Sequence, residues 1–164
     1  MYKKNRKQTI CSLLVCLLLV LLNTSCSNKR KPEVLSEKAL ENIYRETEKP
    51  EVFEAFFRYI FDNNYSAAQQ KAKMYFIEID GENPSRNFLK RFDKHSPEVR
   101  KGSQYRQGEG LLFWLKFTTW IDNNTVKVQG GYDESGLSGS SAPYLLKKKD
   151  GKWSVTEVGP MIIS

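Results

Sequence analysis

The chain contains few of the residues from which catalytic and metal sites are built. Its 164 residues include three cysteines and a single histidine, His95. A zinc site needs three or four cysteine, histidine or carboxylate ligands, and a catalytic triad needs a histidine beside a nucleophile. The acidic pairs Asp80 with Glu82 and Asp133 with Glu134 fall where turns are expected. We therefore expect no catalytic residues, no metal site and no cofactor, and we favour a protein that is not an enzyme.

Long hydrophobic runs are missing as well. The longest apolar segment, Thr9–Leu22, has 14 residues. As a helix it would be about 21 Å long, whereas about 20 apolar residues are needed to cross the hydrocarbon core of a bilayer. Four basic residues precede this segment, Lys3, Lys4, Arg6 and Lys7, and no acid lies among them. A basic leader before a short apolar run is typical of an export signal peptide.

The apolar run leads into the sequence LLNTSC, Leu21–Cys26. It resembles the bacterial lipoprotein box, in which a leucine and small residues precede a cysteine that is acylated and becomes the N-terminus. Asn23 stands where that family prefers leucine. The resemblance implies a signal peptide over 1–26 and a lipid (palmitate) on Cys26. It also implies export and a membrane partner: the protein would be lipid-anchored in the cell envelope, in the outer membrane if the cell has two membranes.

Ordinary signal-peptidase cleavage is the alternative at this segment. Ser25 and Ser27 supply the small-x-small pattern that such a peptidase would cleave after Ser27. In either case the two cysteines of the apolar run leave with the signal peptide, so no disulfide framework is expected. The stretch 27–33, SNKRKPE, would form a basic tether, and 34–164 has the length of a single domain.

The net charge gives little support for a nucleic-acid partner. The formal charge is +7, from 26 Lys and Arg against 19 Asp and Glu. Four of the basic residues and none of the acidic residues precede Cys26, so the rest of the chain carries only +3. The lysines at 147–149 and 152 are expected at a hairpin tip on an exported domain. We therefore expect no nucleic acid among the partners.

The first half of the domain is expected to be helical. Apolar residues recur at spacings of three and four between Leu35 and Tyr44, which predicts an amphipathic helix. Pro50 suits the first turn of a second helix, and Asn63 and Asn64 suit its end. That helix is apolar on most sides, so we expect it to form the core or to line a pocket. Its apolar residues are Val52, Phe53, Phe56, Phe57, Tyr59, Ile60 and Phe61.

The second half is expected to be a sheet. Met74–Ile79 reads as a strand, and a short helix precedes Phe92. The segment Asp93–Gly110 is charged and poorly patterned, so we expect a loop there. Alternating apolar residues and turn signals then predict strands over 111–121, 126–131, 144–146 and 153–158, with Asp150-Gly151 as a hairpin turn.

Helices followed by strands predict an α+β domain, with N-terminal helices packed on a curved antiparallel sheet of about four to five strands. This order of elements resembles the NTF2-like and cystatin-like two-layer domains. The runs YFIEIDGENPSRNFLKRF, GGYDESGL and LKKKDGKWSV are similar to runs in small uncharacterised bacterial exported proteins, many with lipoprotein signals. The resemblance implies a shared fold and export, and it carries over no functional residue.

A candidate binding face lies on the predicted strand 111–121. Strict alternation puts Trp114, Lys116 and Trp120 together on the face that points away from the core. Such tryptophans are either covered by a second layer or line a ligand or partner surface. We therefore expect an envelope lipoprotein that binds a protein or glycan partner without catalysing a reaction. The alternative is an NTF2-like pocket domain that binds or transforms a small molecule.

Overall fold

The computed structural model describes residues 36–64, 66, 72–135 and 138–163. The predicted signal peptide 1–26, the acylation site Cys26 and the tether 27–33 lie outside these residues and stay predictions. Within the described part of the chain, no helix is long and apolar enough to cross a membrane.

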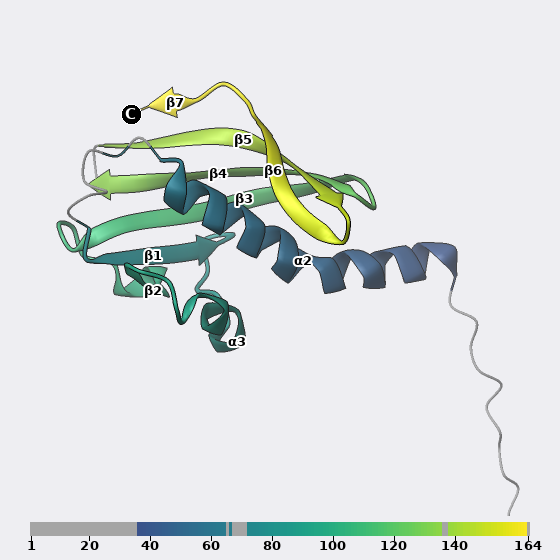
Figure 1. The fold of residues 1–164 in the computed structure, drawn as a ribbon, viewed down its shortest axis with the longest axis horizontal. Helices are drawn as coiled ribbons and strands as arrows, with labels where there is room; N and C mark the ends of the chain where they lie inside the picture. Colours follow the sequence, from purple (N-terminus) through teal and green to yellow (C-terminus); the bar gives the residue numbers. More distant parts are fainter. Residues whose placement is uncertain (1–35, 65, 67–71, 136–137, 164) are drawn as a thin grey trace, which may run out of the picture. The chain divides into compact units, whose positions relative to one another are not determined.

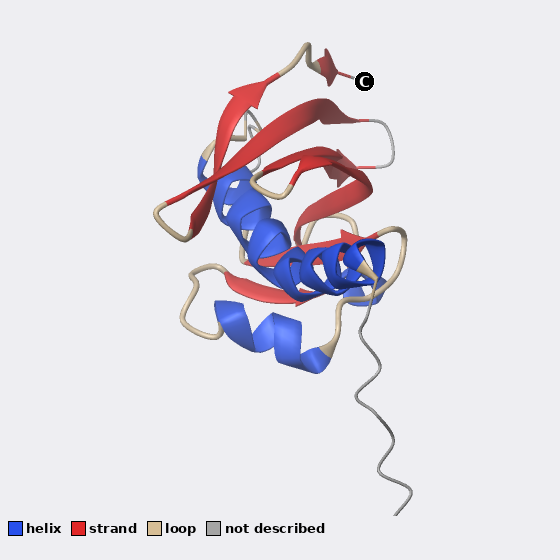
Figure 2. Ribbon diagram, turned by 90° about the vertical axis from the view of Figure 1, so that its right-hand side faces the viewer, coloured by secondary structure: helices blue, strands red, loops and turns tan. Residues whose placement is uncertain are grey.

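A single long helix, α2 (Glu37–Asp62), replaces the two helices predicted from the sequence. Pro50 lies inside it and does not start a second helix. Proline removes one backbone hydrogen bond and crowds the preceding turn, so a helix that continues through it bends. Figures 1 and 2 both show α2 changing direction near its middle. The helix begins at the capping hydroxyl of Ser36 and ends, as predicted, where the Asn63 and Asn64 amides donate to its last carbonyls.

The sheet has more strands than predicted and is mixed. Within the described residues it has seven strands: six run in the order β2-β1-β3-β4-β5-β6, and the seventh, β7, pairs with β5. β1 is parallel to both β2 and β3, whereas the remaining pairs are antiparallel. The strands are β1 (Met74–Ile79), β2 (Glu98–Lys101), β3 (Gly110–Asp122), β4 (Thr125–Ser135), β5 (Ser138–Lys149), β6 (Lys152–Val158) and β7 (Ile162–Ile163).

The α+β class is confirmed. The prediction of a purely antiparallel sheet of four to five strands is wrong, because β1 pairs in parallel with β2 and β3, and because β2 and β7 are additional strands. β2 has the sequence EVRK, which lacks apolar alternation because an edge strand pairs through its backbone and buries little. It lies in the segment that was predicted to be a loop. The turn at Asp150-Gly151 joins β5 to β6 as predicted, with positive φ at both residues.

The second half of α2 forms the core against one face of the sheet, as the dense apolar pattern predicts. Phe56, Phe57 and Ile60 are buried, and so are the facing residues of β3, β4 and β5. The ring centroids of Phe56 and Tyr144 lie 5.0 Å apart in an edge-to-face arrangement. Gly130 of β4 lies so close to Phe56 that a Cβ there would collide with the ring. This part of the helix–sheet interface is therefore filled by side chains.

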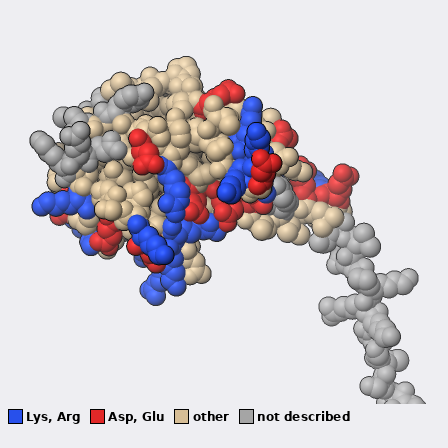
Figure 3. Space-filling view, in the orientation of Figure 1, with Lys and Arg blue, Asp and Glu red and all other residues tan. Residues whose placement is uncertain are grey.

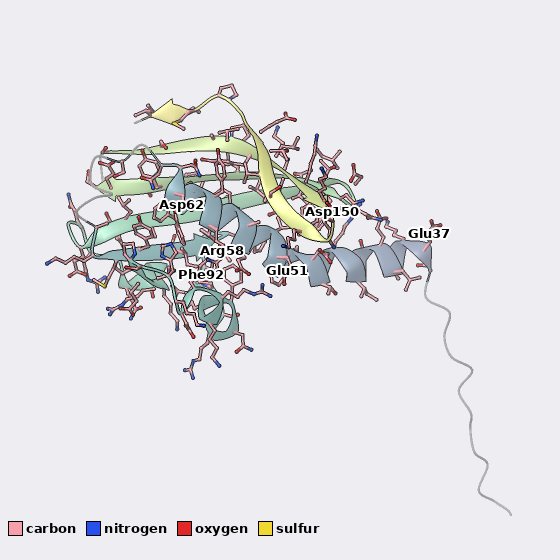
Figure 4. The ribbon with its side chains drawn as sticks, viewed as in Figure 1. Glu37, Glu51, Arg58, Asp62, Phe92 and Asp150 are labelled. Atoms are coloured by element: carbon pink, nitrogen blue, oxygen red, sulfur yellow. The ribbon has the colours of Figure 1, made fainter. Side chains whose placement is uncertain are left out.

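Two short helices are held against the same half of α2. They are α3 (Arg86–Leu89) and η2 (Lys90–Phe92). Arg91 donates to the Glu54 carboxylate over 2.7 Å, and the Arg58 guanidinium lies 5.2 Å from the centroid of the Phe92 ring (Figure 4). These contacts close one side of the core.

The first half of α2 does not pack as its pattern predicts. Leu40 and Ile43 are more than half exposed, at 54% and 53%. Figure 1 shows the reason, because this half of the helix projects beyond the sheet. Its later turns lie beside the strands, where the Arg45 guanidinium covers the Trp120 ring and Glu48 accepts a hydrogen bond from Lys148.

Candidate functional site

The three residues of the predicted binding face do not lie on one face of the sheet. The pairing of β3 with β4 shifts register between Lys116 and Thr119, which marks a β-bulge. Beyond the bulge Trp120 pairs with the buried Val126 and packs against the core. Trp114 and Lys116 stay on the opposite face of the sheet, which we call the outer face. The bulge therefore separates the three predicted residues. Trp114 and Lys116 lie on the outer face, and Trp120 lies on the core side of the sheet.

The outer face brings Trp114 and Lys116 together with two acids that the sequence analysis did not combine. The Trp114 indole hydrogen-bonds the carboxylate of Asp133, and the Lys116 ammonium lies 5.4 Å from the centroid of the Trp114 ring. Glu78 of β1 is in register with Trp114. Asp133 lies within β4 and not in the turn that was expected. The register of β1, β3 and β4 would be needed to find this cluster from the sequence, because Glu78 and Asp133 are far apart in the chain.

Burial is the main influence on the pKa of Asp133 and on that of Glu78. It raises the pKa of the Asp133 carboxyl above its ordinary value, while the hydrogen bond from Trp114 and the charge of Lys116 act in the opposite direction. Burial also raises the pKa of Glu78, with Lys116 opposing it and Asp133 adding to it. Part of the burial of Glu78 comes from η3 (Gly102–Gln104). Gly102 lies so close to Glu78 that a Cβ on it would collide with the Glu78 side chain. The outer-face cluster is thus a partly buried set of interacting charges.

The other site is a pocket of about 420 Å³ between the first half of α2 and the end of β3. We call it the α2–β3 pocket. Helix residues form one wall, and Asp80 after β1 and two residues of β3 form the other. It is lined by Asn42, Arg45, Glu46, Lys49, Phe53, Asp80, Thr118 and Trp120.

Two polar atoms of the lining residues are buried without a hydrogen-bond partner within the described residues. They are Nε of Arg45 and Oγ1 of Thr118. The rest of the Arg45 guanidinium is fixed, because Nη2 donates to Glu41 over 2.5 Å and the group lies 5.9 Å from the centroid of the Trp120 ring. Both atoms have almost no solvent-accessible surface, so they lie behind the pocket wall and a molecule in the pocket does not reach them. Nothing in the sequence marks either residue as part of a site.

A further pocket of about 360 Å³ lies at the C-terminal end of α2. Tyr59 and Tyr144 meet there edge to face, with ring centroids 6.1 Å apart, and Asp62 lies on the rim. We call it the helix-end pocket. Its lining residues are Tyr59, Asp62, Asn63, Asn64, Tyr144, Val158 and Met161.

The described residues contain no group of three or more His, Cys, Asp or Glu side chains that could hold a metal ion. His95 packs against aromatic rings, with its ring centroid 4.9 Å from that of Phe61, and its Nδ1 lies 2.8 Å from the Pro97 carbonyl oxygen. Acidic and basic side chains intermingle over the face shown in Figure 3. The chain matches no protein-family model, and comparisons with curated proteins and with solved structures find no similar protein.

Proposed function

We propose that the protein is an exported, lipid-anchored binding domain that acts without catalysing a reaction and holds its partner through the α2–β3 pocket. The observation that carries this proposal is the α2–β3 pocket itself, a cavity of about 420 Å³ lined by charged and polar side chains beside Phe53 and Trp120. Its volume lies within the range of ligand-binding sites, and its polar groups can orient a bound partner.

The anchor is tested by labelling. We expect Cys26→Ala to abolish incorporation of a palmitate analogue and to move the protein from the membrane pellet to the soluble fraction. Labelling that persists in Cys26→Ala would contradict the lipid anchor on this residue. Labelling that is absent from the unaltered chain would favour the alternative cleavage after Ser27.

The binding role is tested by site-specific photo-crosslinking in intact cells. A crosslinker at Asn42, on the exposed rim of the pocket, should give a discrete adduct, and one at the exposed Glu98 of β2 serves as the matched control. Asp80→Asn, which removes the exposed carboxylate on the opposite wall of the pocket, should weaken the Asn42 adduct. Equal adducts at both positions, or an Asn42 adduct that is insensitive to Asp80→Asn, would contradict a partner at this pocket.

We also propose that the domain is NTF2-like or cystatin-like and related to the small bacterial exported proteins that it resembles. The order of one helix, a strand, a short helix and then a run of strands supports the proposal. It remains at the level of topology, and topology alone assigns no function.

The helix-end pocket favours a second function, in which the domain binds or transforms a small molecule. Its tyrosine pair and Asp62 provide hydroxyl and carboxylate groups beside aromatic walls. A thermal-shift screen of small molecules tests this function. We expect hits whose stabilisation is lost in Tyr59→Ala and kept in Asp80→Asn, whereas the reverse pattern would assign the ligand to the α2–β3 pocket.

A further inference from the structure

The segment 86–101, which contains α3, η2 and β2, carries the positive excess of the chain after Cys26. It has six Lys or Arg against two Asp or Glu, a net charge of +4. The whole chain after Cys26 carries only +3, so all its other residues together carry −1. The positive charge is therefore concentrated in one short segment at the β2 edge of the sheet.

Four basic side chains of this segment are exposed. Phe88 and Phe92 are buried and pack on Phe57 of α2, so they fix the inner side of α3 and η2. α3 also lies against β2. In Figure 3 the side chains that project at the lower edge, where Figure 1 places α3, are mostly Lys and Arg. We call the four exposed residues the basic surface: Arg86, Lys90, Lys94 and Lys101.

The basic surface keeps its charge within the described part of the chain. Arg91 is bound to two acids of α2, and Arg100 is bound to Glu98 over 2.8 Å, so these two arginines are already paired. None of the four residues of the basic surface forms a salt bridge with another described residue. The exposed Asp93 is the remaining acid of the segment, and it leaves a net charge of +3 on this surface.

We infer that the basic surface rests on anionic phospholipids of the membrane that holds the protein, an inference that depends on the proposed lipid anchor at Cys26. Ser36, at the start of α2, is ten residues after Cys26, so the chain between them spans at most about 35 Å. From Ser36 to Glu51, where Arg91 is bound, α2 rises by about 22 Å. The chain before α2 is therefore long enough for the basic surface to reach the headgroups while α2 lies along the bilayer.

The anchor and the charge together favour a membrane over an acidic protein. Each Lys or Arg near an anionic bilayer strengthens attachment about fivefold, within a Debye length of about 8 Å at physiological ionic strength. Because the anchor confines the domain to the bilayer, a net charge of +3 acts there at high effective concentration, whereas an acidic protein must bind from free solution. β2 and β6 are at opposite ends of the six-strand path, so attachment through the basic surface directs the β6 edge away from the membrane.

A polarity-sensitive probe on the acylated protein, reconstituted into vesicles, tests the inference. The dye NBD is attached to Asn87→Cys on the exposed side of α3, and Ser154→Cys, exposed on β6, is the matched control. We expect the Asn87 probe to shift to the blue in vesicles of phosphatidylcholine with phosphatidylglycerol and not in phosphatidylcholine alone. The shift should disappear in about 1 M salt, where the Debye length is about 3 Å. The Ser154 probe should not shift in either lipid.

A second arm removes charge from exposed positions. Lys90→Gln combined with Lys94→Gln should lower the equilibrium constant for attachment about 25-fold, or fivefold per lysine. Lys147→Gln combined with Lys149→Gln makes the same change of charge at the hairpin between β5 and β6, and it should leave the constant unchanged.

The inference is overturned if the Asn87 probe responds equally to neutral and anionic vesicles, if the Ser154 probe shifts as much, or if the two double variants behave alike. A shift caused by poly-glutamate in neutral vesicles, without one caused by anionic lipid, would assign the surface to an acidic protein. An unacylated chain, detected by the Cys26 labelling before reconstitution, would overturn the proposed anchor and the inference together. An acylated chain whose Asn87 probe ignores anionic lipid would leave the anchor standing and remove only the membrane contact.

Discussion

Trp153, near the end of the chain, donates its indole N–H to the Glu48 carboxylate on α2, with 2.7 Å between Nε1 and Oε2. The same oxygen accepts a hydrogen bond from the Lys148 ammonium over 2.8 Å. The hydrogen bond from Lys148 and then that from Trp153 hold the pKa of Glu48 below its ordinary value. This carboxylate therefore ties the middle of α2 to the hairpin formed by β5 and β6.

Replacing Glu48 should loosen that attachment. We expect Glu48→Ala to lower the free energy of unfolding by about 1–3 kcal/mol, because the buried indole N–H loses its acceptor. Chemical denaturation at pH 7 measures the change. Glu157→Ala is the matched control, since its contact with Lys147 is 3.8 Å long and exposed and should be worth little. Equal losses in the two variants would contradict a specific role for Glu48.

The contribution of Glu48 should also depend on pH. A carboxyl group whose pKa is lowered by folding stabilises the folded state above its unfolded pKa, here ordinarily 4.5, and this stability is lost as the pH falls through the folded value. We therefore expect the difference between the parent chain and Glu48→Gln to be constant near pH 7 and to shrink below pH 4.5. Denaturation curves over this range check the sign. A difference that grows on acidification would show that the assignment is wrong.

Asp133 on the outer face should show the opposite sign. Its pKa is raised in the folded state, so the parent chain loses stability as the pH rises from about the ordinary value of 3.8 through the folded value. Asp133→Asn removes this penalty and keeps an acceptor for Trp114. We expect the variant to be at least as stable as the parent at pH 7 and to lose that advantage near pH 3. Thermal melts at the two pH values test this, with Glu134→Gln as the neighbouring control.

The packing of Phe56 against Gly130 allows a double-mutant test of the core. Phe56→Ala should cost about 3–5 kcal/mol, and Gly130→Ala about 1–3 kcal/mol because the new methyl group collides with the Phe56 ring. In the double variant the methyl group enters the space that the ring has left, so its cost should be smaller than the sum of the two. Strict additivity of the measured unfolding free energies would contradict the contact.

The bulge in β3 predicts that its two tryptophans differ in their effect on stability. Trp120 packs against Trp153 and the core, so Trp120→Ala should cost about 2–4 kcal/mol. Trp114 lies on the outer face, and Trp114→Ala should cost less. Equal losses of melting temperature in the two variants would mean that they share one face, as strict alternation predicts.

The elements that the sequence predicted correctly are those with a strong local signal. The dense apolar run from Val52 to Phe61, the asparagines that end α2 and the Asp150-Gly151 turn each follow from the chemistry of a few neighbouring residues. β2 and the parallel pairing of β1 were missed because they depend on backbone pairing between distant segments. Pro50 was misinterpreted because Glu48, just before it, is held by Trp153 and the residues just after it are buried in the core, and these contacts outweigh the loss of one hydrogen bond.

The candidate site was predicted in part. Trp114 and Lys116 do share the outer face, but Trp120 does not, because a bulge adds one residue to the alternation and no residue in Lys116–Thr119 signals it. Arg45 and Thr118 were missed because nothing local marks them. They become candidates only once α2 is seen to cross the end of β3.

The place of α2 in the chain has a consequence for biosynthesis. This helix precedes every strand of the described sheet in the chain. The rings that cover its aromatic face come from β1, α3, η2, β3 and β5, so this face stays uncovered until β5 has been translated. Burial of the core thus depends on contacts between distant segments, which makes folding slower than in a helical bundle of similar size.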